Sequence, residues 1–369
     1  MTTTRMKARL LGITAALVLL SAIPALGKNR KHQPIIPTLP PTPTFAPSTI
    51  PPNGDVNPYG VAFVPHNYQG GGPLQGGDIV VSNFNDSGNV QGTGTTIVRV
   101  TPDANVSVFF QGQSGLGLTT ALGVLRRGFV LVGNLPTTDG SCNTIGQTSL
   151  LIIDQNGSQV ASLSDPNLLN GPWDLTIHDQ GEMAQVFVSN VLSGTVTRIN
   201  MKINRHGNPV VQSMTQIASG YGFACNAAAV VVGPTGLAYD HKKDILYVAS
   251  TADNEMFAVP NARKTMNDGG TGALVYQDNT HLHGPLGLIL DLNGDLITAN
   301  GDAINGDPSQ PSELVEFTTS GQFVGQFSVD PSQGAAFGLA LDSSGNQVTF
   351  AAVDDATNVL DIWDLGDNE

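Results

Sequence analysis

The chain has 369 residues, of which 40% are apolar and only 12% are charged, and it contains 43 glycines and 23 prolines. This balance excludes an intrinsically disordered chain and is typical of a β-rich domain with many turns. The formal net charge of −14 argues against nucleic acid and anionic membranes as partners, because both are negatively charged.

The first 27 residues predict a cleaved export signal. Arg5, Lys7 and Arg9 precede an apolar run from 10 to 20, and residues 25–27 (Ala-Leu-Gly) offer a cleavage site. The run is shorter than the roughly 17–25 residues of a membrane-spanning helix. We therefore expect a secreted or periplasmic protein without stable membrane insertion after cleavage. Loss of three basic residues and no acidic one would change the formal charge from −14 to −17.

Residues 28–57 predict a proline-rich linker. The run from Pro37 to Thr44 is poor in amide donors and favours extended conformations. From residue 58 to 369, short apolar runs alternate with Gly, Asn and Asp. We interpret this second part as one folded domain.

A phrase typified by Pro-x-Gly-Leu-Ala recurs six times in that domain, with starts 63, 51, 62, 51 and 51 residues apart. Such spacing indicates one repeated unit with insertions in two copies. The six copies occupy residues 58–63, 121–125, 172–176, 234–239, 285–290 and 336–341.

Each copy precedes two further runs with the composition of β-strands. The second runs are 78–83, 129–134, 186–190, 245–250, 295–300 and 348–353, and the third runs are 96–100, 149–153, 195–199, 256–259, 313–317 and 359–363. In three units a Gly- or Asn-containing turn then leads to a fourth strand. Four antiparallel strands repeated about every 50 residues predict an all-β, six-bladed β-propeller.

The sixth unit ends soon after its third strand, so we expect it to take its outer strand from upstream of Pro58. The donor of this N-terminal strand latch should lie within residues 34–50. Proline is tolerated there because the outer strand of a blade is an edge strand.

The phrase, followed by a turn and an aliphatic strand ending in Ser/Ala-Asn, resembles the NHL repeat. Over residues 57–365 the chain is similar to exported bacterial NHL-like propellers. The resemblance implies the fold rather than an activity, because this fold hosts binding modules and enzymes alike. We expect a non-catalytic scaffold that binds a protein, glycan or small-molecule ligand through its loop face. No cofactor is expected, with Ca²⁺ kept as a candidate ion.

The alternative hypothesis is a metal-dependent hydrolase or lactonase. Metal lactonases resembling regucalcin and paraoxonase carry Asn or Asp just before the Gly of several first strands. None of the corresponding residues here offers a carboxylate or amide, although hard cations need several oxygen ligands. These residues are Tyr59, Leu122, Trp173, Thr235, Leu286 and Phe337. A quinone-dependent dehydrogenase is a third class, for which only His281 and His283 could serve the cofactor.

The candidate ligand-binding residues lie at the ends of the second strands, on the face where first strands begin. Either they form a polar collar for a ligand or cation, or they cap strand ends as Asn and Asp do in many proteins. The set is Asn83, Asn134, Asn190, Asp253, Asn300 and Asp354. Asp139, Asp302 and Asp355 add acidic character nearby without a recognisable ligand spacing.

His281 and His283 lie in the loop before the fifth first strand, where imidazole can serve as a metal ligand or base. The alternative is that both are simply solvated. The turn from Asp291 to Asp295 is acidic but lacks the bidentate Glu of an EF-hand loop.

Cys142 and Cys225 are the two cysteines. Both fall in expanded loops on the same face, which favours a disulfide over two free thiols in an oxidising compartment.

Overall fold

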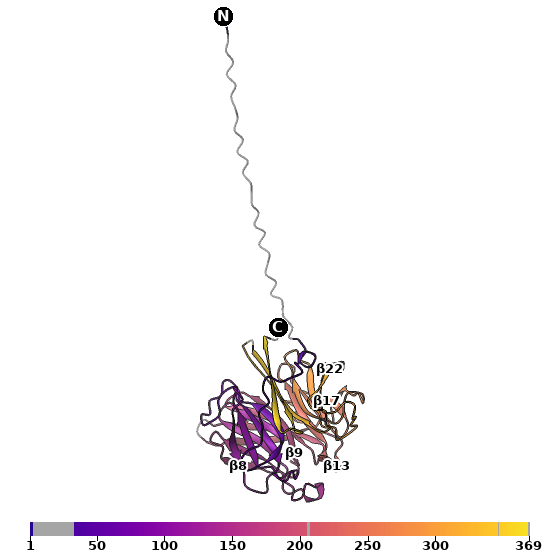
Figure 1. The fold of residues 1–369 in the computed structure, drawn as a ribbon. Coiled ribbons are helices and arrows are strands. Elements are labelled where there is room, and N and C mark those ends of the chain that lie inside the picture. Colours follow the sequence, from indigo (N-terminus) through magenta and orange to yellow (C-terminus); the bar gives the residue numbers. More distant parts are fainter. Residues whose placement is uncertain (3–32, 205–206, 346, 368–369) are drawn as a thin grey trace. The chain divides into compact units, whose positions relative to one another are not determined.

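The computed structural model describes residues 1–2, 33–204, 207–345 and 347–367. The predicted export signal, apart from its first two residues, lies outside these ranges. Residues from 33 onwards form six antiparallel sheets arranged as a six-bladed β-propeller, as the repeat predicts (Figure 1).

In each blade the strands follow one another in chain order, and the innermost strand is the repeated phrase. Blades 1 to 3 comprise β1 (Val56–Phe63), β2 (Ile79–Asn85), β3 (Thr96–Val100) and β4 (Val106–Gln111); β5 (Leu118–Leu125), β6 (Phe129–Asn134), β7 (Ser149–Asp154) and β8 (Gln159–Leu163); and β9 (Pro172–Asp179), β10 (Met183–Asn190), β11 (Thr195–Lys202) and β12 (Val210–Ser219). Blades 4 to 6 comprise β15 (Pro234–Asp240), β16 (Ile245–Ser250), β17 (Glu255–Pro260) and β18 (Ala273–Tyr276); β19 (Pro285–Leu290), β20 (Leu296–Asn300), β21 (Glu313–Phe317) and β22 (Phe323–Ser328); and β23 (Ala336–Ser344), β24 (Gln347–Asp354) and β25 (Val359–Asp367).

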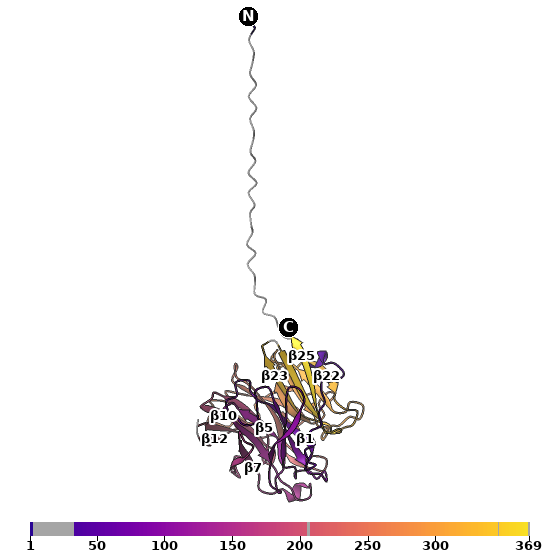
Figure 2. The same cartoon turned by 60° about the vertical axis from the view of Figure 1, so that its left-hand side comes forward.

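The core is divided among the interfaces between blades. Six hydrophobic clusters each combine residues of two adjacent blades, and a seventh lies on the central axis. The innermost strands contact their neighbours in a complete circle, from β1 through β5, β9, β15 and β19 to β23 and back to β1. Figure 2 shows β1 and β5 side by side. Each sheet buries both faces against its neighbours, so the ring needs no separate core.

The glycine of the phrase marks the closest approach between blades. A Cβ atom at Gly236, Gly287 or Gly338 would collide with the backbone carbonyl oxygen of the next innermost strand. The third blade carries Asp174 at this position, and its carboxylate instead accepts the backbone N–H of Leu237 at 3.0 Å. The glycine of the Pro-x-Gly pattern is therefore explained by the close approach of neighbouring innermost strands around the axis.

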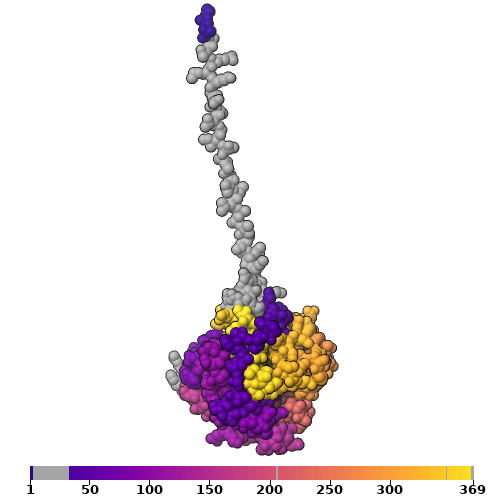
Figure 3. Space-filling model, in the orientation of Figure 1, coloured from indigo at the N-terminus to yellow at the C-terminus, as the bar shows by residue number. Residues whose placement is uncertain are grey.

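The sixth blade confirms the predicted latch. Its three strands are extended by the segment 44–49, which pairs antiparallel with β25 through bridges from Phe45 to Ile362 and from Ser48 to Val359. Ile362 donates its backbone N–H to the Phe45 carbonyl at 2.8 Å. Figure 3 shows these N-terminal residues, in indigo, beside the yellow C-terminal strand.

Two insertions depart from the repeat. A short 3-10 helix, η2 (Cys142–Thr144), follows β6, and a hairpin of β13 (Ala224–Asn226) and β14 (Val230–Val232) precedes β15. The Cys142–Cys225 disulfide joins them, with a Cα–Cα distance of 5.6 Å, which confirms the predicted pairing. The described residues contain no helix with the length and apolarity that a bilayer crossing requires.

Candidate functional site

A cavity of about 420 Å³ opens at the mouth of the central channel. Its lining comes from the starts of innermost strands, the ends of second strands and the loops beyond them. This is the face on which the sequence places its candidate residues. A cavity of this size can hold a small organic molecule.

The floor of the cavity is aromatic. Tyr59 stacks on Phe84 at 4.9 Å between ring centroids and contacts Phe337 at 4.6 Å and Trp173 at 5.8 Å. Tyr59 and Trp173 are almost fully buried, and Trp173 Nε1 has no hydrogen-bond partner in the described part of the chain. These rings close the channel and offer an apolar surface to a ligand.

One wall is the inserted hairpin of β13 and β14. Val231 and Val232 line the cavity, and three contacts fix the hairpin to different blades. Gln91 donates its side-chain amide to Ala228 O at 2.9 Å, Asn226 donates to Ala303 O at 3.2 Å, and Cys225 forms the disulfide. The hairpin is therefore held over the mouth from blades 1, 2 and 5.

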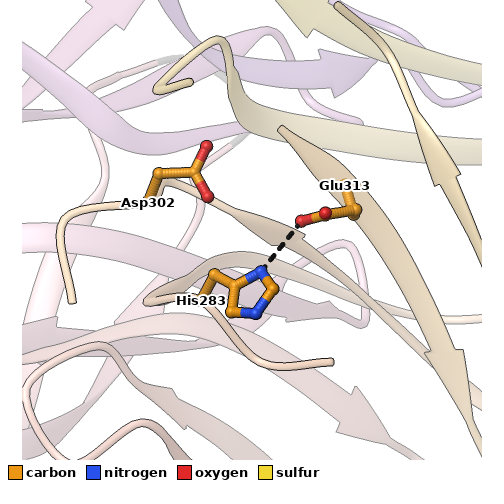
Figure 4. A group of neighbouring side chains, drawn as sticks. All are labelled: His283, Asp302 and Glu313. Carbon is orange, nitrogen blue, oxygen red and sulfur yellow. Dashed lines mark hydrogen bonds and ion pairs between the residues drawn. The ribbon is translucent and has the colours of Figure 1, made fainter. Parts of the chain in front are cut away.

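A group of three potential metal ligands lies in blade 5. His283 precedes β19, Asp302 follows β20 and Glu313 begins β21, and one ligand atom from each lies within 4.8 Å of the others. Figure 4 shows the three side chains converging. His283 and Glu313 are 1% and 2% exposed, and Asp302 also lines the cavity. Asp302 therefore belongs both to this group of potential metal ligands and to the wall of the cavity.

Two oxygens of this group have no hydrogen-bond partner among the described residues. Asp302 Oδ2 accepts the backbone N–H groups of Ser312 and Gly334 at 2.9 and 2.8 Å, while its Oδ1 is buried and unpartnered. Glu313 Oε2 lies 3.2 Å from His283 Nδ1, while Oε1 is likewise unpartnered. Burial raises the pKa of both carboxyls. One imidazole and two orphaned carboxylate oxygens suit a transition-metal ion such as Zn²⁺.

Asp355 is the second acidic group in the cavity wall. Burial, together with the neighbouring charge of Asp354, raises the pKa of Asp355 to about 7. No hydrogen bond joins its carboxylate to another of the described residues. A carboxylate that titrates near neutral pH and faces a ligand cavity can act as a general base.

The collar residues do not line this cavity. Four of them are bonded to the loop that leads into their own blade: Asn83 to Thr49 O, Asn134 to Gly117 N, Asn190 to Leu168 O, and Asn300 to His281 O and His283 N. Asp253 accepts the N–H of Gly222, and Asp354 binds Thr357. Ligand binding by the collar stays a prediction, and the observed bonds are those of structural caps.

The two histidines have different surroundings. His281 stacks on Phe323 with ring centroids 3.9 Å apart and bonds to Asp278 at 2.5 Å, outside the cavity. Burial of Asp278 opposes ionisation, but hydrogen bonds from His281, Thr280 and Tyr276 outweigh it and lower the pKa of Asp278 to about 2. Of the predicted pair, only His283 joins the group with Asp302 and Glu313.

Metal lactonases carry their ligands just before the glycine of several innermost strands, and most of the residues at these positions here line the cavity. Tyr59, Trp173, Thr235, Leu286 and Phe337 are in its wall, whereas Leu122 lies deeper in the channel. They form an apolar floor in place of a ring of oxygen ligands. These positions offer a metal ion neither a carboxylate nor an amide, whereas His283, Asp302 and Glu313 are suitable ligands beside the cavity.

Sequence reasoning missed Glu313 and the hairpin. Glu313 begins the run Glu-Leu-Val-Glu-Phe, whose charged residues suggest solvent exposure, yet its side chain is buried. The valine run from 230 to 232 beside Cys225 was an available signal for the hairpin.

Comparison with known proteins identifies the fold. No family model matches the chain, and no curated protein sequence matches it either. Among solved structures it is similar to a gluconolactonase from Xanthomonas campestris, with a TM-score of 0.53 and 14% identity over 91% of this chain and 95% of the other. A luciferin-regenerating enzyme gives 0.54 and 10% over 87% and 96%. Regucalcin from Agrobacterium tumefaciens, a calcium-binding protein, gives 0.51 and 13% over 86% and 93%.

These similarities correct the expectation of a non-catalytic scaffold. The structural neighbours include a gluconolactonase and a luciferin-regenerating enzyme, so they favour the alternative, enzymatic hypothesis over the scaffold. At these identities the likeness itself establishes the fold alone. An activity has to be argued from the residues around the cavity.

Proposed function

We propose that this protein is a metal-dependent hydrolase that opens lactones or esters in the cavity at the channel mouth. One observation carries the proposal: Asp302 belongs both to the group with His283 and Glu313 and to the cavity wall. The aromatic floor would bind the apolar face of the substrate and exclude water from it. The substrate class is therefore a small ester or lactone with a hydrophobic side.

The residues His283, Asp302 and Glu313 would hold the metal ion. His283 Nδ1 is the imidazole nitrogen that faces Glu313 Oε2, at 3.2 Å (Figure 4), and its lone pair would coordinate the ion when the proton is on Nε2. A bound ion would polarise the substrate carbonyl and lower the pKa of a bound water. The unpartnered oxygens of Asp302 and Glu313 supply negative charge that such an ion neutralises.

Asp355 is the proposed general base. Its carboxylate would take a proton from the attacking water while the water oxygen bonds to the carbonyl carbon. The bond from that carbon to the ester or ring oxygen then breaks, and Asp355 returns the proton to the leaving alkoxide. A pKa of about 7 leaves much of the group ionised at neutral pH, as this role requires.

The test combines metal content with turnover. Purified protein should contain metal by elemental analysis and hydrolyse members of a lactone and ester panel. Turnover should disappear on chelation and return with Zn²⁺ or Mn²⁺. Asp302→Asn should lose both turnover and one equivalent of metal, because it removes a ligand charge that faces the cavity.

Asp307→Asn is the matched control, since Asp307 lies in the same loop but outside the group and the cavity. It should keep wild-type metal content and turnover. Absence of turnover across the panel in metal-loaded protein, or turnover that survives removal of all metal, would contradict the proposal.

Two broader assignments accompany this proposal. The blade pattern supports membership of an NHL-like propeller family, although no family model matches. The disulfide supports an extracytoplasmic location, because oxidising compartments preserve such bonds. Cleavage of an export signal from the purified protein, read by N-terminal sequencing, tests the location.

A further inference from the structure

A second group of carboxylates lies at the opposite end of blade 5 from the cavity. Asp291 follows β19, Asp295 precedes β20 and Glu316 lies within β21. One oxygen from each lies within 4.8 Å of the others. The sequence shows an acidic turn without the Glu of a calcium loop, and the fold brings Glu316 to that turn from another strand.

The negative charge of this group is not compensated. Asp291 is 6% exposed and Glu316 is 0% exposed, and Asp291 Oδ2 is buried without a partner. Among the described residues no Lys, Arg or His forms an ion pair with the three acids. Lys243 influences Asp295, but its ammonium group is paired with Asp240 at 3.4 Å and its side chain is 53% exposed. Buried carboxylates in this arrangement require a cation or shared protons.

Glu316 also holds the N-terminal segment. Its carboxylate accepts the backbone N–H groups of Ile35 at 3.3 Å and Ile36 at 2.7 Å. Ile35 and Ile36 are buried in the cluster between blades 5 and 6, and Ile36 begins the 3-10 helix η1 (Ile36–Thr38). This segment leads directly into the latch at residues 44–49. The acidic group therefore contacts the N-terminal segment just before the residues that pair with β25.

We propose that Asp291, Asp295 and Glu316 bind a hard divalent cation, Ca²⁺ first among them, and that this ion fixes the N-terminal segment to blade 5. The donors are all oxygens, which Ca²⁺ and Mg²⁺ prefer. Among the described residues Asp291 Oδ2 has no hydrogen-bond donor, although Asp291 and Glu316 are close enough to share a proton, and no hydrogen bond engages the Asp295 carboxylate. Each Glu316 oxygen has two lone pairs, so it can accept an N–H group and bind an ion together.

The burial of the Asp291 and Glu316 carboxylates is consistent with a site whose negative charge a cation neutralises. It raises the pKa of Asp291, and with the charge of Asp291 it raises the pKa of Glu316 to about 8. The proposed ion would favour the ionised form of both. The site is separate from the hydrolase proposal, because none of its residues lines the cavity at the channel mouth.

The test uses the full chain, stripped by a chelator and then given Ca²⁺ or Mg²⁺ alone. Amide hydrogen exchange of peptides covering residues 34–39 and thermal unfolding are measured. With free Ca²⁺ at about 100 times its Kd, opening of this segment should be suppressed about a hundredfold. Unchanged exchange and an unchanged melting temperature in millimolar Ca²⁺ would overturn the proposal.

Variants separate the two sites. Asp295→Asn should abolish the Ca²⁺ response while leaving Glu316 free to hold Ile35 and Ile36. Asp302→Asn should keep the full response, whether or not the protein hydrolyses any substrate. If Asp295→Asn responds like the wild type, or if the segment loosens only as the pH rises through about 8 and ignores Ca²⁺, the group holds protons and the cation assignment is wrong.

Discussion

At the scale of single residues, the protein uses acidic side chains in environments that change their chemistry. Asp302 and Glu313 are partly desolvated and have unpartnered oxygens. Asp355 instead faces a cavity without a hydrogen-bond partner. These differences separate the residues suited to hold an ion from the residue suited to move a proton.

Asp355 gives the pH prediction. As a base it must be ionised, so kcat/KM should rise as the pH increases through about 7, the pKa of this group. Asp355→Asn should lower kcat/KM by about 10²–10⁴-fold and remove that limb of the profile. A pH–rate profile of both proteins on the best panel substrate measures this.

The stability of the same variant provides the control. A raised folded-state pKa means that wild-type stability declines as the pH rises from about 4 through about 7. Asp355→Asn removes this penalty, so its melting temperature at pH 8 should be no lower than that of the wild type. A variant that keeps the wild-type pH profile of activity would contradict the role of Asp355.

At the scale of elements, the inserted hairpin of β13 and β14 differs from the blades because its strands pair with each other and with no other described strand. It forms a two-stranded sheet of its own, and the disulfide of Cys225 ties it to blade 2 across 83 residues of sequence. The disulfide and the hydrogen bonds from Gln91 and Asn226 together take the place of the strand pairing that fixes the other elements.

Removal of that bond should be costly. The double substitution Cys142→Ser with Cys225→Ser should lower the free energy of unfolding by roughly 4 kcal/mol, as the entropy of a cross-linked loop of this length implies. Denaturant titration measures the loss. A thiol reductant should reproduce it in the wild type and leave the double variant unchanged; equal stability of both proteins with and without reductant would disprove it.

The elements also show what the sequence could predict. The innermost strands were predictable because the sequence Pro-x-Gly-Leu-Ala recurs where neighbouring blades approach most closely. At Gly338, for example, a Cβ atom would collide with the backbone carbonyl oxygen of Tyr59, so the position requires glycine. The group of His283, Asp302 and Glu313 was not predictable, because its members are 19 and 11 residues apart and meet only after two chain reversals. Glu313 and Glu316 are charged residues three apart in the run Glu-Leu-Val-Glu-Phe, a composition that suggests exposure, yet both are buried between blades.

At the scale of the whole ring, closure depends on residues from both ends of the described chain. The bridge from Phe45 to Ile362 and the contacts of Ile35 and Ile36 with Glu316 attach one N-terminal segment to blades 5 and 6. The first blade packs on the sixth through a shared hydrophobic cluster. Ile35, Ile36 and Leu39 of the segment complete the interface between blades 5 and 6.

Deletion through residue 50 should destabilise the ring. It would leave β25 as an unpaired edge and expose the cluster that Ile35, Ile36 and Leu39 help to form. Hydrogen exchange should increase first in β25 and the neighbouring strands, with a lower melting temperature. A chain that begins at Gln33 is the matched control and should unfold like the full chain; equal unfolding of both truncated chains would refute the prediction.

The pairing of residues 44–49 with β25 has a consequence for the order of events during synthesis. The N-terminal segment leaves the ribosome first, but its partner strand is made more than 300 residues later. Blades can form as they emerge, because their strand pairs are close in sequence, whereas the ring cannot close until the last blade exists. Until then blade 1 exposes the apolar face that packs on blade 6 in the closed ring. The slowest step in the folding of this domain should therefore be the pairing of residues 44–49 with β25, which closes the ring.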